Sequence, residues 1–403
     1  MSRQGRFAMA CFARSGDDEF ARALESQGML DFYALGTRRG VRGIPAEHTR
    51  LQPAFGLLNY IAACLLPNYQ AESFRFRLFP IFDRWAKSLL QPGQHFFTGY
   101  AFAPRSMRWT RQHGGLTFLD AWTSHPEGFW NLLTEEQQRW GSRFPPVSRF
   151  YHDLAVQSVA EADYICTSST FVRESFLKRG FDPRRLLLCP YAVDLETFRP
   201  PDEKRPPHRP FTLLHTGGLS LRKGAPYLFQ AFELIRKEVP DAVLRIKRDI
   251  RNDAEEIVRR YAHLPIEWSE SLNLPDHVRR YQTSDLLLFP SVEDGFAFVV
   301  AEALACGLPV ITTVNTGASD LVEPGQNGEV VPIRDPNALA TAALKWWDLI
   351  RQGKTIDNYE KLKRQLSAER FNRTFIGHLE NIGAVPFPDE PSESISPERC
   401  FIL

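Results

Sequence analysis

A proline-rich segment divides this chain of 403 residues into two halves of nearly equal length. It reads PPDEKRPPHRP from Pro200 to Pro210, and five prolines with charges between them cannot pack as a helix or a strand. On both sides of it, short apolar runs typical of buried strands alternate with helical patterns. We therefore predict an α/β fold in which two Rossmann-like β/α/β domains face each other across a cleft.

The expected domain boundaries follow from this division. Residues 1–200 are expected to form the first domain, residues 201–210 the linker, and residues 211–365 the second domain. Residues 366–384 are predicted to form a helix that crosses back to the first domain. Residues 385–403 are rich in Pro, Ser and Glu, which predicts a disordered tail.

Composition excludes several classes of function. The net charge of +1 leaves no strong field to recruit nucleic acid. No apolar run reaches the roughly 18 residues of a membrane span, and the N-terminal stretch lacks a signal-peptide cleavage site. The six cysteines lack metal-ligand spacing, and no other metal motif is present. We expect a cytoplasmic protein with no metal and no cofactor.

Two features of the first half, one segment and the overall charge balance, leave alternatives open. Ser73–Leu90 carries aromatic and basic residues and is either an amphipathic helix for lipid contact or part of the core, with Pro80 interrupting it. The 24 Lys and Arg against 19 Asp and Glu in residues 1–200 allow peripheral contact with the inner face of a membrane, although ordinary scatter explains them as well. Residues 134–161 look helical throughout.

The most informative stretch is FPSVEDGFAFVVAEALACGLPVITT, which runs from Phe289 to Thr313. A buried strand ends near Phe289, a polar turn follows, and a helix begins near Phe298. The exposed amides at such a helix start bind anions at the carboxyl edge of the sheet. Glu302 lies eight residues after Asp294, so that both carboxylates can face the same crevice. Its apolar neighbours make Glu302 a buried carboxylate, which implies a partner.

This stretch resembles the signature of retaining glycosyltransferases of the GT-B fold, family 4 (group 1) type. The pattern D-G-F-x-x-x-x-x-E-A-L-A-x-G-x-P-V-I places Asp294 where the first glutamate of the family usually stands, and Glu302 as the second. The resemblance spans residues 150–345 well and residues 1–120 weakly. It implies a transferase that moves a sugar from a nucleoside diphosphate to an acceptor hydroxyl. The first domain would then bind the acceptor and the second the donor.

The resemblance also implies roles for individual residues. Glu302 is expected to bind the donor ribose. The transferred sugar and the diphosphate are expected to be bound by Asp294, Gly295 and Phe296, and Asp294 is also expected to be catalytic. Backbone amides near the phosphates are expected from Phe298, Val299 and Val300.

The loop HTGGLSLRKG, from His215 to Gly224, is expected beneath a phosphate, because Gly217 and Gly218 permit a tight turn. Arg222 and Lys223 would stabilise the charge of the departing nucleoside diphosphate, unless they are a solvated pair. Lys223 matches the family lysine and is counted as catalytic, whereas Gly218 stands where the family has an arginine. Arg222 or the run Lys247–Arg251, which includes Arg248, is the candidate replacement.

Two features of the first half resemble the acceptor side of the family. His125 follows a predicted strand, and its position resembles a histidine that orients the transferred sugar; a local cap is the alternative. Ser15 and Gly16 resemble the first loop of the family, which faces the phosphates. The terminal Cys400-Phe401-Ile402-Leu403 fits a prenylation pattern that we interpret as a chance match.

The predicted function is retaining sugar transfer in polysaccharide, lipopolysaccharide or other glycoconjugate synthesis. Its partners would be a nucleotide-sugar donor and a glycan or lipid-linked glycan acceptor. Two alternatives remain open: another GT-B enzyme, such as a sugar-nucleotide epimerase, and a non-catalytic partner subunit. The pattern does not identify the nucleotide base.

Overall fold

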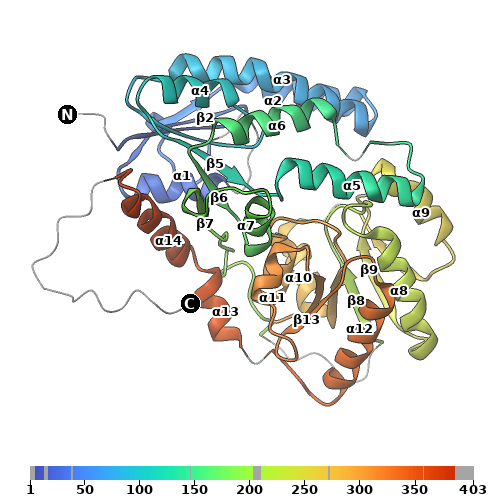
Figure 1. Ribbon diagram of the computed structural model, residues 1–403. Coiled ribbons are helices and arrows are strands. Elements are labelled where there is room, and N and C mark those ends of the chain that lie inside the picture. The colour runs from blue at the N-terminus through green and yellow to red at the C-terminus, as the bar shows by residue number, and fades with distance from the viewer. Residues whose placement is uncertain are drawn as a thin grey trace, which may run out of the picture.

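The computed structural model places two α/β bodies one above the other (Figure 1). It describes residues 5–12, 17–37, 40–145, 147–202, 210–270, 273–356 and 358–385. Ser15, Gly16, most of the predicted linker, the predicted tail after Val385, and Cys400 lie outside the described residues.

The upper body contains a parallel sheet of seven strands in the order β3-β2-β1-β4-β5-β6-β7. Its strands are β1 (Phe7–Cys11), β2 (Leu30–Leu35), β3 (Thr49–Leu51), β4 (His95–Gly99), β5 (Thr117–Ala121), β6 (Tyr164–Thr167) and β7 (Leu186–Leu188). Its helices are α1 (Asp17–Ser26), α2 (Pro53–Leu65), α3 (Asn68–Leu89), α4 (Pro104–Gln112), α5 (Pro126–Trp140), α6 (Arg149–Glu161) and α7 (Thr170–Leu177).

The lower body contains a parallel sheet of six strands in the order β10-β9-β8-β11-β12-β13. Its strands are β8 (Thr212–His215), β9 (Val243–Lys247), β10 (Ile266–Ser269), β11 (Leu286–Phe289), β12 (Val310–Thr313) and β13 (Gly328–Val331). Its helices are α8 (Ala225–Glu238), α9 (Glu255–Arg260), α10 (Leu274–Thr283), α11 (Phe298–Ala305) and α12 (Pro336–Arg351). The expected fold of two Rossmann-like domains is confirmed.

The strand order decides where a ligand can bind. In each sheet the order reverses beside the first strand, between β1 and β4 above and between β8 and β11 below. The crevice outside the carboxyl ends of strands at such a reversal is the usual ligand site of an open α/β sheet. The loops after β8 and β11, which hold the predicted phosphate loop and the Asp294 turn, therefore meet at one point.

The chain end returns to the upper body, as Figure 1 shows in red. After α13 (Tyr359–Leu366), helix α14 (Ala368–Asn381) packs against α1. The ring of Phe20 in α1 meets Phe371 and Phe375 of α14 at centroid distances of 4.9 and 4.8 Å. Aromatic burial therefore fastens α14 to the body in which the chain begins.

The predicted continuous helix over residues 134–161 is wrong. Two helices cover this region, α5 and α6, with a loop between them. Gly141 ends α5 in the left-handed conformation at φ 63°, which glycine adopts without steric cost. Pro145, a few residues on, cannot continue a helix.

Helix α3 also differs from the expectation, because Pro80 lies inside it and does not interrupt it. A proline within a helix costs about 3 kcal/mol through its missing N–H and its ring. Burial offsets this cost, since Phe76, Phe79 and Phe82 are each at most 6% exposed. The aromatic side chains of Ser73–Leu90 thus belong largely to the core, which was one of its two open alternatives.

The two bodies are also joined by a buried charge. Glu136 of α5 is fully buried; its Oε1 pairs with Arg334 of the lower body, and its Oε2 accepts a hydrogen bond of 2.8 Å from the Tyr227 hydroxyl in α8. Trp140 donates to the same hydroxyl at 3.2 Å. A buried carboxylate needs such partners, and here both come from the other domain.

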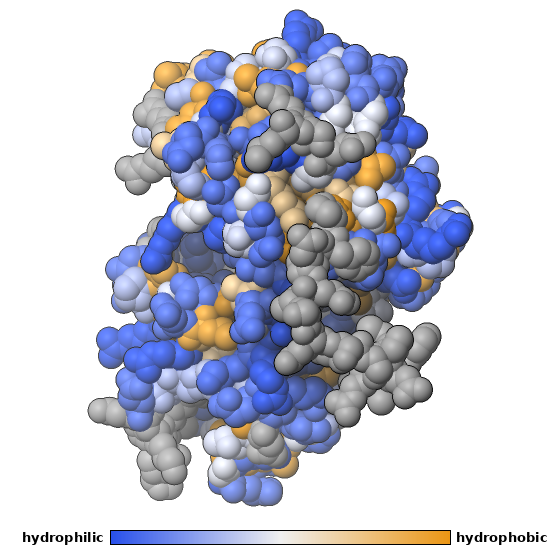
Figure 2. Space-filling model, turned by 90° about the vertical axis from the view of Figure 1, so that its left-hand side faces the viewer, coloured by the Kyte–Doolittle hydropathy of each residue, from blue (hydrophilic) through white to orange (hydrophobic). Residues whose placement is uncertain are grey.

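Hydrophilic residues cover most of the face seen in Figure 2, and hydrophobic ones form separate patches on it. No described helix has the combination of length and apolar character that crossing a membrane requires.

Arg334→Met is predicted to lower the free energy of unfolding by about 2–4 kcal/mol, because it leaves the buried Glu136 carboxylate with only the more distant Arg139, at 4.0 Å, as its cation. Denaturant unfolding followed by tryptophan fluorescence measures this loss. The matched control is Arg184→Met, which removes an arginine whose side chain is 90% exposed in a surface pair and should change stability by at most about 0.5 kcal/mol. Equal effects of the two substitutions would contradict a stabilising role for the buried pair.

Candidate active site

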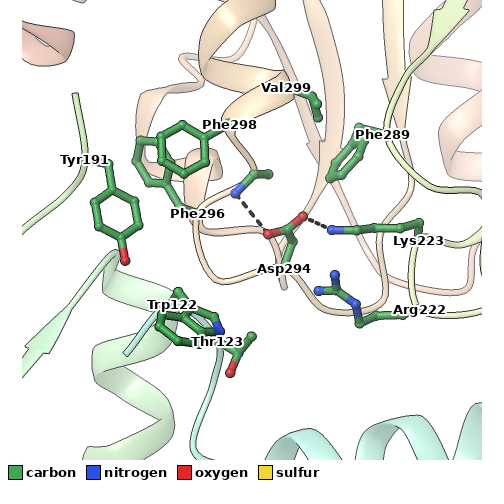
Figure 3. A pocket seen from close by; sticks show the side chains of 12 residues that line it. Trp122, Thr123, Tyr191, Arg222, Lys223, Phe289, Asp294, Phe296, Phe298 and Val299 are labelled. Carbon is green, nitrogen blue, oxygen red and sulfur yellow. Dashed lines mark hydrogen bonds and ion pairs between the residues drawn. The ribbon is translucent and has the colours of Figure 1, made fainter. Parts of the chain in front are cut away.

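A cavity of about 390 Å³ lies between the two bodies, at the reversal of strand order in the lower sheet (Figure 3). The upper body contributes Trp122 and Thr123, which directly follow β5, and Tyr191 comes from the segment after β7. The loops after β8 and β11 supply most of the remaining lining, which comprises Gly217, Arg222, Lys223, Phe289, Asp294, Phe296, Ala297, Phe298 and Val299.

Two adjacent ion pairs form the polar side of this cavity. Lys223 Nζ pairs with Asp294 Oδ2, and Figure 3 shows this contact beside the Arg222 guanidinium. Arg222 Nη1 pairs with Glu293 Oε2 at 3.1 Å and also donates to the Glu293 carbonyl. Arg222 and Lys223 are therefore held by two consecutive carboxylates, which contradicts the alternative that they are a solvated pair.

Burial and charge set the protonation of these groups. Burial raises the pKa of Glu293, with Arg222 acting against it. Burial also opposes ionisation of Asp294, but Lys223 and Arg222 outweigh it and lower the pKa of that carboxyl below its usual value. Asp294 is consequently a firmly ionised group beside two cations, which suits hydrogen bonds from sugar hydroxyls.

Helix α11 begins at the cavity wall. Asp294 Oδ1 accepts a hydrogen bond of 3.0 Å from the Ala297 amide, and Ala297 holds a left-handed conformation at φ 61°. Phe298 and Val299, the first two helical residues, line the cavity as expected. The Val300 prediction is wrong, because its side chain is fully buried and its amide donates to the Ala297 carbonyl at 2.9 Å.

Gly295 serves a contact that the sequence interpretation did not foresee. A Cβ at this position would stand 1.9 Å from the Trp122 carbonyl oxygen of the other domain. The Gly295 carbonyl accepts hydrogen bonds from the Ser168 and Ser169 hydroxyls at 3.1 and 2.6 Å. The missing Cβ therefore allows a close approach to protein backbone, and Gly295 is not among the residues that line the cavity. Its contact with sugar or diphosphate stays a prediction. Phe296, next to it, does line the cavity.

Glu302 has the partner that its burial required. Its Oε2 accepts a hydrogen bond of 2.7 Å from the Tyr281 hydroxyl and lies 3.6 Å from His277 Nε2, both on α10. Glu302 is not among the residues that line the cavity with Asp294. The cavity that Asp294 lines is therefore not a crevice shared with Glu302, whose carboxylate contacts α10.

The loop after β8 meets a second basic loop. Gly217, at φ 100°, lines the cavity with Arg222 and Lys223. A Cβ on Gly218 would lie 3.1 Å from Arg251 Nε, because Leu219 and Ile250 form a parallel bridge. Of the candidate cations in Lys247–Arg251, Arg251 therefore occupies the space beside Gly218. Arg248 is directed elsewhere, toward Glu270 and the Trp268 ring.

His125 lies away from the cavity. Its Nδ1 accepts a hydrogen bond of 3.3 Å from the Glu127 amide, so it caps the start of α5. Its ring packs against Phe176 and Phe181, and burial lowers its pKa to about 4. This is the local cap that was the alternative to a sugar contact. The first-loop residues Ser15 and Gly16 lie outside the described residues.

A second cavity of about 520 Å³ adjoins the first and shares Trp122, Thr123, Arg222 and Lys223 with it. Aromatic rings dominate its upper wall. They are Phe12, Tyr69, Phe76, Phe79, Phe102, Phe129, Phe144 and Tyr151. Gly218, Ser220, Arg251, Asn252 and Asp253 line its lower side. Among the described residues, the buried Asp253 Oδ1 has no hydrogen-bond partner.

Sequence interpretation missed several residues that line the two cavities or join the domains. Trp122 and Thr123 follow β5 at the carboxyl edge of the sheet, so the reasoning applied to His125 should have begun three residues earlier. Glu293 was seen only as part of a polar turn, although its Oε1 accepts from the Ser124 amide of the other domain at 2.9 Å. No described cluster of three or more His, Cys, Asp or Glu residues is arranged to hold a metal.

Comparison with known proteins finds a family model and relatives that are similar to the half of the chain that contains most of this site. Residues 210–348 match the family model described as "Glycosyl transferases group 1". The chain is 29% identical over 207 residues to a D-inositol 3-phosphate glycosyltransferase of Geodermatophilus obscurus, covering 46% of each chain. It is also 29% identical over 202 residues to one of Xylanimonas cellulosilytica, covering 46% of this chain and 48% of the relative. The matches span about half the length of these relatives.

Solved structures match over nearly the whole chain. A sucrose-phosphate synthase of Thermosynechococcus elongatus has a TM-score of 0.67 at 18% identity, covering 94% of this chain and 100% of its own. The Anabaena protein HepE in complex with UDP has a TM-score of 0.62 at 15% identity, covering 93% and 100%. These likenesses show the fold alone, which is the GT-B arrangement of two Rossmann-like domains.

Asp253→Asn is predicted to stabilise the protein at neutral pH. Burial raises the pKa of Asp253 to about 6 in the folded protein, above the value near 4 of an unfolded chain. The folded state therefore binds more protons between these values, so stability falls as pH rises from about 4 to about 6 and the full penalty is present above that range.

The asparagine removes this titration, with a gain on the order of 2 kcal/mol at pH 7.5 that vanishes near pH 4. Denaturant unfolding at several pH values measures it. Asp182→Asn, at a carboxyl whose pKa is lowered by its contacts with Arg184, should show no gain at pH 7.5. A gain for Asp253→Asn that is independent of pH would contradict the assignment.

Proposed function

We propose that this protein is a retaining hexosyltransferase, because residues 210–348 match the glycosyl transferases group 1 model and the chain has the GT-B fold. It moves a sugar from a nucleoside diphosphate to an acceptor hydroxyl. The observation that carries this proposal is the Lys223–Asp294 pair in the cavity between the domains. It places a cation for the departing diphosphate beside a carboxylate for the sugar.

The donor would lie across the start of α11. The leading amides of that helix, from Phe298 and Val299, point a positive dipole end at the cavity and suit the diphosphate. Gly217 leaves room for the phosphates, and Asp294 accepts hydrogen bonds from the sugar. Glu302, held by Tyr281, would bind the ribose hydroxyls beyond the cavity. No cofactor or metal takes part in this scheme.

Departure of the nucleoside diphosphate concentrates negative charge on its phosphates, and positioned cations stabilise that charge. Arg222 and Lys223 are preorganised for this by their carboxylate partners. Asp294 is the one carboxylate among the described residues lining the cavity, and Lys223 already binds it. We therefore favour front-face attack, in which the leaving phosphate accepts the acceptor proton. A trapped glycosyl-enzyme adduct would contradict this mechanism.

The second cavity is the natural place for the acceptor, because it adjoins the donor cavity and shares Trp122 and Thr123 with it. Aromatic side chains stack on sugar rings and on apolar groups alike. A glycan or lipid-linked glycan in glycoconjugate synthesis fits such a wall. We place the reaction in the cytoplasm, where nucleotide sugars serve as donors.

The activity test incubates the purified chain with labelled UDP-, GDP- and ADP-sugars, with and without lipid-linked acceptors. Label that moves to an acceptor with unchanged anomeric configuration supports the proposal. Free sugar released without acceptor would favour an epimerase-type GT-B enzyme. A cellular phenotype that survives Glu302→Ala would favour a non-catalytic subunit.

Glu302→Gln is predicted to weaken nucleoside diphosphate binding about tenfold, because a charge-assisted hydrogen bond to ribose becomes a neutral one. The thermal shift produced by UDP, GDP and ADP measures it, since bound ligand raises the melting temperature by mass action. Glu329→Gln is the control, as that side chain pairs only with Lys345 on the surface among the described contacts. Unchanged affinity in Glu302→Gln would remove Glu302 from the donor site.

Arg251→Ala is predicted to lower kcat at least tenfold with little change in stability, because it removes the cation beside Gly218. The alanine also vacates the space that a side chain at 218 would occupy. Gly218→Arg in that background should therefore recover part of the lost activity. Steady-state kinetics of the two variants, with Arg248→Ala as the control, tests this. A double variant no better than Arg251→Ala would contradict the replacement.

A further inference from the structure

Helix α2 presents an apolar face that no described part of the chain covers. Five of its large apolar side chains are 40–77% exposed: Leu57, Leu58, Tyr60, Ile61 and Leu65. We call these five residues the α2 face. The helix buries Phe55 and Ala62, so its inner side is also apolar. A surface helix ordinarily turns polar residues outward, and a contiguous exposed apolar face marks a contact site.

The sequence around α2 keeps this surface free of charge. Between Arg50 and Glu72 there is no Asp, Glu, Lys or Arg. Helix α3 has two acidic residues. Glu72, in its first turn, is 49% exposed and pairs with Arg75 at 3.1 Å. Asp83 is 1% exposed and accepts hydrogen bonds from the Ser106 amide and hydroxyl at the start of α4. No exposed carboxylate of residues 73–90 therefore opposes an anionic partner.

Beyond Glu72, which Arg75 pairs, the exposed charges of α3 are basic. Phe55 of α2 packs on Phe82 and Trp85 of α3, at centroid distances of 5.7 and 6.4 Å, so the two helices lie side by side. One turn before Trp85, Ile81 is 53% exposed. Arg77, Arg84 and Lys87 are the exposed charged residues of α3 around it. An apolar face with a basic border is the pattern of a helix that lies in an anionic membrane interface.

A second copy of the chain fits this surface less well. A twofold contact through α2 would place the same patch on both subunits, and the basic borders of α3 would meet each other. A bilayer that contains anionic lipid covers the apolar residues and neutralises the border at the same time. Charge complementarity thus favours lipid over self-association.

Helix α3, which follows α2 in the chain, lines the cavity proposed for the acceptor. Leu66 and Pro67 join α2 to α3, and the first turns of α3 bring Tyr69, Glu72 and Arg75 to the wall of the second cavity. A surface fixed to lipid by α2 would therefore hold this cavity close to the bilayer.

We propose that the α2 face, with the basic side of α3, docks this protein on an anionic lipid surface. The corollary that the acceptor reaches the second cavity from the bilayer rests on the proposed function, whereas docking itself does not. Membrane contact was one of two alternatives for Ser73–Leu90. The proposal places this contact on α2, and α3 supplies the basic charge.

The test is co-sedimentation of the full chain with vesicles of phosphatidylcholine containing about a third phosphatidylglycerol, and with phosphatidylcholine alone. The chain should sediment with the first and much less with the second. The variant Leu58→Glu/Ile61→Glu/Leu65→Glu should lower the bound fraction about tenfold or more. Arg77→Gln/Arg84→Gln/Lys87→Gln should remove the preference for phosphatidylglycerol and its sensitivity to salt.

The control is Leu274→Glu/Val314→Glu, which places two glutamates at exposed apolar residues of the other domain, 54% and 52% exposed, and is compared with Leu58→Glu/Ile61→Glu. It should bind vesicles like the unaltered chain. Melting temperature and the thermal shift with nucleoside diphosphates show that each variant is folded and test the donor site separately. Absence of sedimentation, or equal loss in the control, would overturn the proposal. A dimer seen by light scattering that the α2 variant dissociates, without vesicle binding, would make the face a subunit interface.

Discussion

Two consecutive carboxylates, Glu293 and Asp294, organise the space between the domains. Each holds one cation of the loop after β8, and Glu293 also accepts the Ser124 amide of the opposite domain. The four charged side chains are between 0% and 31% exposed. Such burial of charge is tolerated only because each has an oppositely charged partner and further hydrogen bonds. The arrangement therefore fixes the polar wall of the cavity and the approach of the two domains with the same set of contacts.

Gly295, which lies between Asp294 and Phe296, also determines how closely the two domains approach each other. Gly295 lets the turn after β11 reach the backbone of Trp122, and a Cβ on Gly317 would stand 1.8 Å from the Gly295 carbonyl oxygen. A side chain at Gly295 would force the two bodies apart, whereas one at Gly317 would displace the Gly295 turn within the lower body. The D-G-F sequence is thus a requirement of domain packing as much as of ligand binding. Only Asp294 and Phe296 of these three residues line the cavity.

The periodicity of hydrophobic residues, with glycine and proline marking the ends of elements, was sufficient to predict the α/β class and most strands of the second half. The strand Leu286–Phe289 and the helix after it could be predicted because the apolar run, the polar turn and the helix start all lie within one local stretch. Contacts between the domains could not be predicted, because no residue near Glu293 in the sequence indicates that Ser124 lies opposite it. The split between α5 and α6 was missed because a left-handed Gly141 leaves little trace in a helical pattern. Pro80 caused the opposite error. We expected it to interrupt a helix, but the burial of aromatic side chains in α3 offsets its local cost.

The separation of Asp294 from Glu302 bears on how the motif works. Spacing along the chain implied one shared crevice, but Glu302 faces α10 and is oriented by Tyr281, while Asp294 faces the cavity and is oriented by Lys223. Helix α11 therefore connects two differently held carboxylates, with its amide end between them. A donor that touches both would extend along the start of this helix, with its sugar near the domain boundary and its nucleoside toward α10. The loops that differ most from the family pattern, around Gly218 and Arg251, lie on the phosphate side of that path. These departures concern how charge is supplied to the phosphates, whereas Asp294, in place of the usual glutamate, is a separate departure at the proposed sugar contact.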